Sequence, residues 1–281
     1  MSSRIIERLG LRRRHVNRIA VTAVAVILLV VVMAPMFWMV SGSFKTEREV
    51  VTLQAFPAEL RLINYVTIIA RAPLMRWFAN SVIVSAFATA ITVVLALFAG
   101  YSLGRLRFPG RNFLFMLTLS GFMIPIHAIM IPLFLFLRDM GLANQYGGLI
   151  LPLIVHPVSV LVITQFFKSI DRDFEDAART EGAGEFRLLF QIMAPMAVPA
   201  IATVSVFVFV YTWNEFLWPL LIAQSPSMYT LPVGLATLAG GDLQVRFGPI
   251  MAASVIASLP VFIVYLFLQK YLAGGIAIET K

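Results

Sequence analysis

The chain has 281 residues and a formal net charge of +8, with 60% hydrophobic and 13% charged residues. A soluble domain has roughly 45–50% apolar and roughly 25% charged residues, so this composition excludes a water-soluble globular protein. The basic residues flank apolar runs and form no extended basic surface, which gives no support to nucleic-acid binding. The absence of cysteine excludes disulfides, thiolate metal sites and a cysteine nucleophile.

Six charge-free windows are each longer than the about 20 residues that cross a hydrocarbon layer of about 30 Å. They are Ile19–Val40, Trp77–Gly104, Asn112–Leu137, Gly141–Phe167, Leu188–Asn214 and Phe247–Gln269. We therefore predict an all-α, polytopic membrane helix bundle with six transmembrane helices, near residues 19–40, 80–104, 112–137, 147–167, 196–217 and 247–269. Residues 1–18 form a basic N-terminus, residues 19–270 the transmembrane domain, and residues 271–281 a C-terminal tail.

The distribution of lysine and arginine predicts the orientation. With six spans, 15 of these residues lie on the side of the two termini and seven lie on the other side. Because cytoplasmic loops carry the excess of basic residues, the N-terminus and C-terminus are both predicted to be cytoplasmic. The first apolar run is too long for the core of a cleaved signal peptide, so it is interpreted as an uncleaved span.

Prolines and small residues interrupt the apolar runs. Ala96, Gly100 and Gly104 recur every four residues, which places them on one helix face and permits close helix approach. Prolines predict kinks in the third and fourth spans, at Pro125, Pro132, Pro152 and Pro157.

A seventh charge-free window, Phe216–Gly241, contains Pro219, Pro226 and Pro232 together with several glycines and serines. This composition breaks a helix repeatedly, and a lipid-exposed span must satisfy its own backbone. Residues 218–246 are therefore predicted to form an ordered external loop, with a re-entrant element as the alternative.

The chemistry of energy coupling is absent from the chain. No phosphate-binding loop is present, because the dipeptide Gly-Lys never occurs. An ion-coupled carrier would place ionisable groups at membrane depth, and Glu215, at the end of the fifth span, is the one exception. A membrane hydrolase would need a nucleophile beside a base, and Ser120 with His127 is the sole weak candidate. The three histidines form no metal-spaced pair, so no metal site is predicted.

The loop between the fourth and fifth spans, residues 171–195, reads as a helix–turn–helix. Asp173 is predicted to cap a helix that begins at Phe174, and Glu175 and Arg179 have the spacing of an ion pair. Gly182 and Gly184 predict a turn, after which Glu185–Met193 forms a second short helix. Small residues on an exposed charged helix suit insertion into the groove of another protein.

This loop resembles the signature loop of ABC importer membrane subunits, in which Glu-Ala-Ala is followed after three residues by glycine and after nine more by Ile-x-Leu-Pro. Here Asp176-Ala177-Ala178 precedes Gly182, and Ile192-Met193-Ala194-Pro195 follows. Asp176 replaces the glutamate and Ala194 replaces the leucine. The stretches SGSFKT, NYVTI, FANSVIVS, YSLGRLRFPGRN, WNEFLWPL and LPVGLATLAG are similar to the carbohydrate-uptake branch, especially the smaller membrane subunit of maltose transporters. The ending GGIAIETK departs from that family.

The resemblance implies a non-catalytic permease subunit of a bacterial or archaeal cytoplasmic (inner) membrane. A coupling helix over Glu175–Gly182 would be seated in a separate ATP-binding subunit, which uses ATP and magnesium, while this chain binds no cofactor itself. The implied coupling residues are Glu175, Asp176, Ala177, Ala178, Arg179, Glu181, Gly182 and Ala183. The implied partners are a second homologous permease in a heterodimer, two copies of the ATP-binding subunit, an extracytoplasmic solute-binding protein and a sugar.

The resemblance also implies that the external loop reaches the solute-binding protein through Leu231, Pro232, Val233 and Gly234. The alternative is that this loop packs on its own bundle. A path without charged residues, offering Asn80, Tyr211 and Asn214, suits a neutral hydroxyl-rich molecule better than an anion. This pattern does not distinguish a disaccharide from a longer oligosaccharide or a glycerol phosphodiester.

Overall fold

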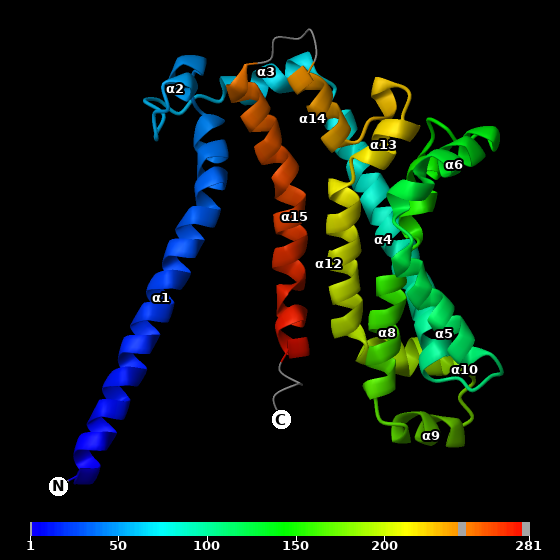
Figure 1. The fold of residues 1–281 in the computed structure, drawn as a ribbon. Helices are drawn as coiled ribbons and strands as arrows, with labels where there is room; N and C mark the ends of the chain where they lie inside the picture. The colour runs from blue at the N-terminus through cyan, green and yellow to red at the C-terminus, as the bar shows by residue number, and fades with distance from the viewer. Residues whose placement is uncertain (1, 241–245, 277–281) are drawn as a thin grey trace. The chain divides into compact units, whose positions relative to one another are not determined.

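The computed structural model describes residues 2–240 and 246–276, and the side chains of 21–238 and 246–270. The regular structure in these ranges is helical (Figure 1). The chain divides into two units, one of residues 1–71 with 243–256 and the other of residues 72–242 with 257–281. Each unit is described by itself.

The first unit contains α1 (Ser2–Gly42), α2 (Glu47–Val51), α3 (Ile63–Arg71) and the first part of α15 (Phe247–Ile276). The apolar part of α1, Val21–Gly42, is 22 residues long and mostly exposed, as a helix that faces lipid or a partner would be. The turn after α1 is closed by Lys45, which is 1% exposed. Its ammonium donates to the carbonyl of Gln54 and lies 4.2 Å from the ring centroid of Trp38.

The second unit is built around α4 (Leu74–Gly104), a helix of 31 residues. The segments that follow it are α5 (Arg111–Ser120), η1 (Gly121–Met123), α6 (Ile126–Asp139), α7 (Tyr146–Ile150), η2 (Leu151–Ile154), α8 (Pro157–Ser169), α9 (Asp173–Thr180), α10 (Glu185–Arg187), the π-helical η3 (Leu188–Met193), α11 (Ala194–Met196), α12 (Val198–Asn214), α13 (Leu217–Ile222), η4 (Pro226–Met228) and α14 (Leu231–Gly240).

Three helices are long and apolar enough to cross a membrane alone: Val21–Gly42, Leu74–Gly104 and Phe247–Lys270. Three further helix pairs are long and apolar enough only when their two members are taken together. These pairs bend by 96° between α5 and α6, by 46° between α7 and α8, and by 78° between α11 and α12. The protein is therefore a multi-pass, all-helical membrane protein over the residues described.

Prolines account for two of the three bends, at the breaks before α6 and α8. The residue before proline is disfavoured in the α-helical region. Ile124, which precedes Pro125, has φ −94° and ψ 107°, and His156, which precedes Pro157, has φ −124° and ψ 93°. Each proline then begins or caps the next helix, where its missing N–H costs no hydrogen bond. The kinks predicted at these two prolines are thus complete breaks.

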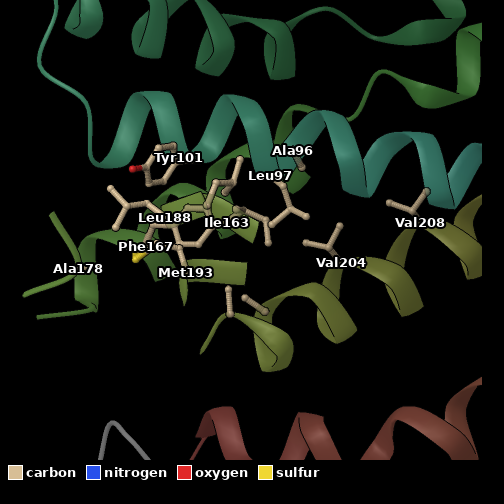
Figure 2. Close-up of a cluster of buried hydrophobic side chains, with 13 residues drawn as sticks. Ala96, Leu97, Tyr101, Ile163, Phe167, Ala178, Leu188, Met193, Val204 and Val208 are labelled. Carbon is tan, nitrogen blue, oxygen red and sulfur yellow. The ribbon is translucent and has the colours of Figure 1, made fainter. Parts of the chain in front are cut away.

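The face of small residues on α4 lies against α8. A Cβ at Gly100 would stand 2.6 Å from Cγ2 of Ile163 and 3.1 Å from the backbone nitrogen of Thr164, so this position admits no side chain. Ala96, Ile163, and Val204 and Val208 of α12 join one buried apolar cluster (Figure 2). The close approach predicted from the four-residue spacing is therefore present.

The predicted external loop is largely helical in the residues described, since residues 218–240 contain most of α13 and all of η4 and α14. Pro226 lies in the first turn of η4, where the helix tolerates it. The N–H of Leu231, at the start of α14, donates to Oγ of Ser81 at 2.8 Å, so α4 satisfies a donor that the short helix cannot. The segment therefore contains more helix than its composition indicated; residues 241–245 lie outside the description.

Candidate functional site

The predicted coupling segment begins with α9, an eight-residue helix whose two faces differ. Glu175 and Ala178, three positions apart, are buried, whereas Asp176, Ala177 and Arg179 are exposed. Glu181, Gly182 and Ala183 follow the helix, and the first two of these are exposed. The motif thus supplies one face to its own chain and leaves the other face open.

A buried ion pair holds the inner face of α9 to the C-terminal end of α4. Nε of Arg105 contacts Oε1 of Glu175, and both residues are less than 9% exposed. Nη1 of Arg105 also donates to the carbonyls of Phe167 at 3.0 Å and Ile170 at 2.8 Å, at the end of α8. One planar guanidinium therefore joins the ends of α4 and α8 to α9, which matches the several donors that arginine presents in one plane.

A second link runs through Glu185, at the start of α10. Its Oε2 accepts a hydrogen bond of 2.6 Å from the hydroxyl of Tyr101, and its Oε1 lies 2.6 Å from Nη1 of Arg179. Hydrogen bonding from Arg179 holds the pKa of the Glu185 carboxyl below its ordinary value, and the same contact raises the pKa of Arg179. The carboxylate therefore stays ionised and bridges α4 to the end of α9.

The apolar seat of α9 is the cluster shown in Figure 2. Ala178 belongs to a buried cluster that includes Tyr101 of α4, Phe167 of α8, Leu188 and Met193. Ala178 is 7% exposed, and its cluster neighbours Phe167, Leu188 and Met193 are fully enclosed. The second alanine of the motif is therefore a packing residue in this chain.

The glycine of the motif ends α9. Gly182 has φ +82°, a left-handed conformation that costs glycine no steric energy. The N–H of Ala183 donates to the carbonyl of Ala178, and the N–H of Gly182 donates to the carbonyl of Arg179, both at 3.0 Å. This pair of bonds is the Schellman motif, which satisfies the last carbonyls of a helix and reverses the chain.

Two local expectations for this segment were wrong. Asp173 is the first residue of α9 and not its cap; the side chain of Asp171 accepts the N–H of Asp173 at 3.3 Å instead. Glu175 and Arg179 do not pair with each other, because Arg105 and Glu185 provide partners from outside the helix. Tertiary contacts override the i,i+4 spacing here.

A cleft of about 600 Å³ opens beside the inner edge of α9. Its walls come from the end of α4 and the following turn, from Arg172 and from the charged residues of α9 and α10. The exposed face of α9 and this cleft together present backbone, small side chains and both signs of charge, a surface typical of a helix that docks on another protein.

At the opposite end of α4, Asn80 is fully enclosed and holds the segment before α14. Its amide nitrogen donates to the carbonyls of Ser227 at 2.9 Å and Tyr229 at 2.8 Å, and its oxygen accepts from the hydroxyl of Tyr146 at 2.7 Å. A side chain with all these groups engaged lines no open path, so this placement differs from the expectation that Asn80 contacts a substrate.

The four residues predicted to reach the solute-binding protein lie at the start of α14, packed on α4. Leu231 and Val233 are fully buried, and a Cβ at Gly234 would stand 2.1 Å from the ring of Trp77. Pro232 is half-buried. The alternative weighed from the sequence, a segment packed on its own bundle, describes these positions.

Tyr211 and Asn214 lie near the end of α12 and are exposed. The ring of Tyr211 meets that of His156 at 4.8 Å between centroids and stacks near Phe207 at 6.5 Å. Oε1 of Glu215 accepts the N–H of Trp218 at 3.1 Å, so this carboxylate satisfies a backbone donor in the first turn of α13. Of the three residues predicted to line the path, Tyr211 and Asn214 are accessible, whereas Asn80 is buried.

The coupling segment and the α14 segment are far apart. Asn80 and Tyr101 are separated by 21 positions on α4, which at 1.5 Å per residue is roughly 30 Å, the thickness of a hydrocarbon layer. Figure 1 shows α9 at one end of α4, and α13 and α14 at the other. The two sites therefore lie at opposite ends of α4, separated by about the thickness of a hydrocarbon layer.

Sequence reasoning missed Arg105, Tyr101 and Glu185 as functional residues. In the sequence, Arg105 is one of the basic residues that predict the orientation of the chain. It lies 70 positions from Glu175. The charge of Arg105, at the end of an apolar run, was the one available signal, and it could not name a partner.

Residues 92–278 match the family described as binding-protein-dependent transport system inner membrane component. The chain belongs to this family. It is 35% identical over 270 residues to the arabinooligosaccharides transport system permease protein AraQ of Bacillus subtilis, with 94% of this chain and 95% of AraQ covered. It is 34% identical to the diacetylchitobiose uptake system permease protein NgcG of Streptomyces coelicolor, over 89% of this chain and 84% of NgcG.

The trehalose/maltose transport system permease protein MalG of Thermococcus litoralis is 28% identical, over 95% of this chain and 97% of MalG. The fold is shared with the crystal structure of a bacterial ABC transporter involved in the import of the acidic polysaccharide alginate, at a TM-score of 0.81 and 22% identity, over 93% of this chain and 98% of that chain.

The resemblance to the permeases of carbohydrate-uptake ABC importers is thereby confirmed. The chain is the membrane-spanning permease subunit of a binding-protein-dependent importer. It is not an enzyme, because ATP hydrolysis in such importers belongs to a separate subunit.

Proposed function

We propose that this permease forms half of the translocation path for a neutral sugar or oligosaccharide and that α9 is the helix through which an ATP-binding subunit drives it. The membrane is the cytoplasmic (inner) membrane of a bacterium or archaeon. Each bent helix pair counts as one span, which gives six spans with both termini cytoplasmic, in agreement with the excess of basic residues on that side. ATP and magnesium bind to the partner ATPase subunit and not to this chain.

The observation that carries the proposal is the rigid connection between α9 and α4. The ion pair of Arg105 with Glu175 is buried, and separating its charges would be costly. A displacement of α9 therefore carries the ends of α4 and α8 with it. The outer face of α9, with Asp176 and Ala177, and Glu181 just after the helix stay open for the ATPase subunit. Two copies of that subunit would close on ATP, one on this permease and one on a homologous second permease.

The substrate class is supported by the relatives and by the exposed side chains. AraQ, NgcG and MalG are named for arabinooligosaccharides, diacetylchitobiose and trehalose/maltose. Tyr211 and Asn214 offer a ring and an amide, which bind hydroxyl-rich rings by stacking and hydrogen bonds without a counter-charge.

For the solute-binding protein, we propose a contact over the exposed side of α14. Leu231, Val233 and Gly234 form the packed base, and Pro232 is half-accessible. Ala236 and Thr237, two and three residues beyond Gly234, are exposed. This arrangement supports a contact built on the predicted segment but presented by the residues that follow it.

Two matched substitutions, each of an exposed alanine by arginine, test the proposal in complexes purified from native membranes. Ala177→Arg places a bulky charge on the open face of α9, and we expect the ATPase subunit to co-purify at least about tenfold less. Ala236→Arg makes the same change on α14, and we expect normal co-purification but loss of ATP hydrolysis stimulated by the binding protein.

If Ala177→Arg retains both the ATPase subunit and the stimulated hydrolysis, α9 is not the docking helix. If Ala236→Arg retains full stimulation, the contact on α14 is refuted while the assignment of α9 stands. Size-exclusion chromatography of the two variants shows whether the permease subunits still assemble.

A further inference from the structure

A pocket of about 450 Å³ lies where α5 begins, next to the cleft beside α9, with which it shares Arg107, Phe108 and Arg172. Its lining includes three arginines, Arg107, Arg111 and Arg172, together with the rings of Phe108 and Phe113. The lining contains no aspartate or glutamate. The pocket is therefore lined by positive charge and by two aromatic rings.

These arginines have no ion-pair partner within the part of the chain that the structure describes. Arg111 donates one bond, of 3.3 Å, to the carbonyl of Leu106, and none of the three arginines joins an ion pair among the described residues. The carboxylates of Glu175 and Glu185 in the adjacent cleft have other partners, as described above. Asp176 shares that cleft with Arg172 but does not line this pocket.

The pocket adjoins a surface that suits acyl chains. Phe113, Met116 and Leu117 of α5 are 70%, 64% and 56% exposed, so an apolar stripe leaves the pocket along the helix. Nζ of Lys168 lies 4.6 Å from the ring centroid of Phe115, which puts a fourth cation beside the same helix. A positive pocket at the end of an exposed apolar stripe fits an anionic head group with attached chains better than it fits a soluble anion.

We propose that Arg107, Arg111 and Arg172 bind the phosphate of an anionic phospholipid whose acyl chains lie along α5. The planar guanidinium groups match phosphate oxygens in pairs, and the three charges are enough to distinguish an anionic from a zwitterionic head group. Because Arg172 immediately precedes α9, the bound lipid ties α5 to the start of the coupling segment. That the lipid belongs to the cytoplasmic leaflet rests on the proposed orientation; the binding itself does not.

Native mass spectrometry of the whole complex, released from neutral detergent, measures this binding directly. Phosphatidylglycerol and phosphatidylcholine of equal chain length are the two probes. We expect wild type to retain phosphatidylglycerol roughly a hundredfold more tightly than the combined variant Arg107→Gln, Arg111→Gln and Arg172→Gln, at about one factor of five per charge. Phosphatidylcholine should bind both proteins alike.

The matched control is Arg48→Gln, Arg61→Gln and Arg138→Gln, which removes three exposed charges elsewhere and should leave lipid retention unchanged. A lysine version of the pocket, with Arg107→Lys, Arg111→Lys and Arg172→Lys, should keep most of the preference because it keeps the charge. Melting temperatures of all variants in neutral detergent identify any that misfold.

Equal phosphatidylglycerol retention by wild type and the glutamine variant would overturn the proposal. So would displacement of the lipid by millimolar inorganic phosphate, which would indicate a site for the free anion. Loss of the ATPase subunit from the glutamine variant, without a change in lipid retention, would assign the arginines to that interface instead. None of these outcomes depends on whether Ala177→Arg uncouples the transporter.

Discussion

Arg105 is 7% exposed and serves three elements of the fold at once. Its partners are the carboxylate of Glu175 and two backbone carbonyls at the end of α8. A buried charge is costly unless it is paired, so each member of this ion pair depends on the other. The pair is best understood as a device that sets the position of α9, with little net gain in stability over an apolar pair.

Replacing Arg105 alone should therefore harm the protein more than replacing both partners. We expect Arg105→Met to cost about 3 kcal/mol, because Glu175 is left buried and unpaired. The double variant Arg105→Met with Glu175→Leu should recover at least about 1 kcal/mol of that loss. Arg105→Lys should not rescue, since a point charge cannot reach three acceptors.

Thermal unfolding of the detergent-solubilised complex gives the stability of all four proteins in a double-mutant cycle. Strictly additive effects of the two substitutions would contradict the pairing. Coupled ATP hydrolysis is the functional readout: the double variant should be stable yet still transport poorly, since the link from α9 to α4 is gone.

The sequence predicted which residues belong to the coupling segment but not what each one does. The motif placed Asp176, Ala177 and Ala178 on one short helix, and the structure divides them between an exposed face and a packed face. That division depends on Tyr101 and Phe167, which come from distant helices. No local pattern contains this information.

At the scale of elements, α9 shows which helix signals were reliable. The glycine end was predicted, because a left-handed residue at the end of a helix is a property of the backbone. The residue that caps the start of α9 was not predicted correctly. Asp171 and Asp173 are two positions apart, and either side chain could accept a backbone N–H at the start of the helix. Helix ends set by backbone geometry can be predicted better than those set by side-chain choice.

The packing of α4 on α8 gives a second test at this scale. Gly100→Leu should destabilise the protein by at least about 2 kcal/mol, because its side chain would collide with Ile163 and with the backbone at Thr164. Gly184→Ala is the matched control: nothing lies within 4 Å of its added carbon, and its φ is −78°. Melting temperatures in detergent compare the two variants, and equal values would refute the close approach.

The segment from α13 to α14 shows the limit of composition as a guide. Three prolines and several glycines predicted a loop, yet each helix there is short enough to begin or end at a breaker. Asn80 and Ser81 of α4 satisfy backbone groups that a short helix leaves unpaired. The helices are therefore stabilised by tertiary contacts that the sequence could not display.

For the whole molecule, the orientation can be tested directly because the natural chain has no cysteine. Ser169→Cys lies at the α9 end and Gln224→Cys at the α14 end, and both positions are exposed. In intact cells we expect a membrane-impermeant maleimide to label Gln224→Cys and to leave Ser169→Cys unlabelled until the membrane is opened. Labelling in the reverse order would invert the proposed topology.

Composition and short sequence patterns were enough to predict an all-helical membrane protein, the positions of its apolar runs and the loop that carries the family motif. Those properties depend on composition, charge and short spacings, which are local. The three bent helix pairs, the hold of Asn80 on the segment before α14 and the anchoring of α9 by Arg105 became visible in the folded chain alone. Each of these depends on groups from distant parts of the chain satisfying one another's hydrogen bonds and charges in a medium that offers them no water.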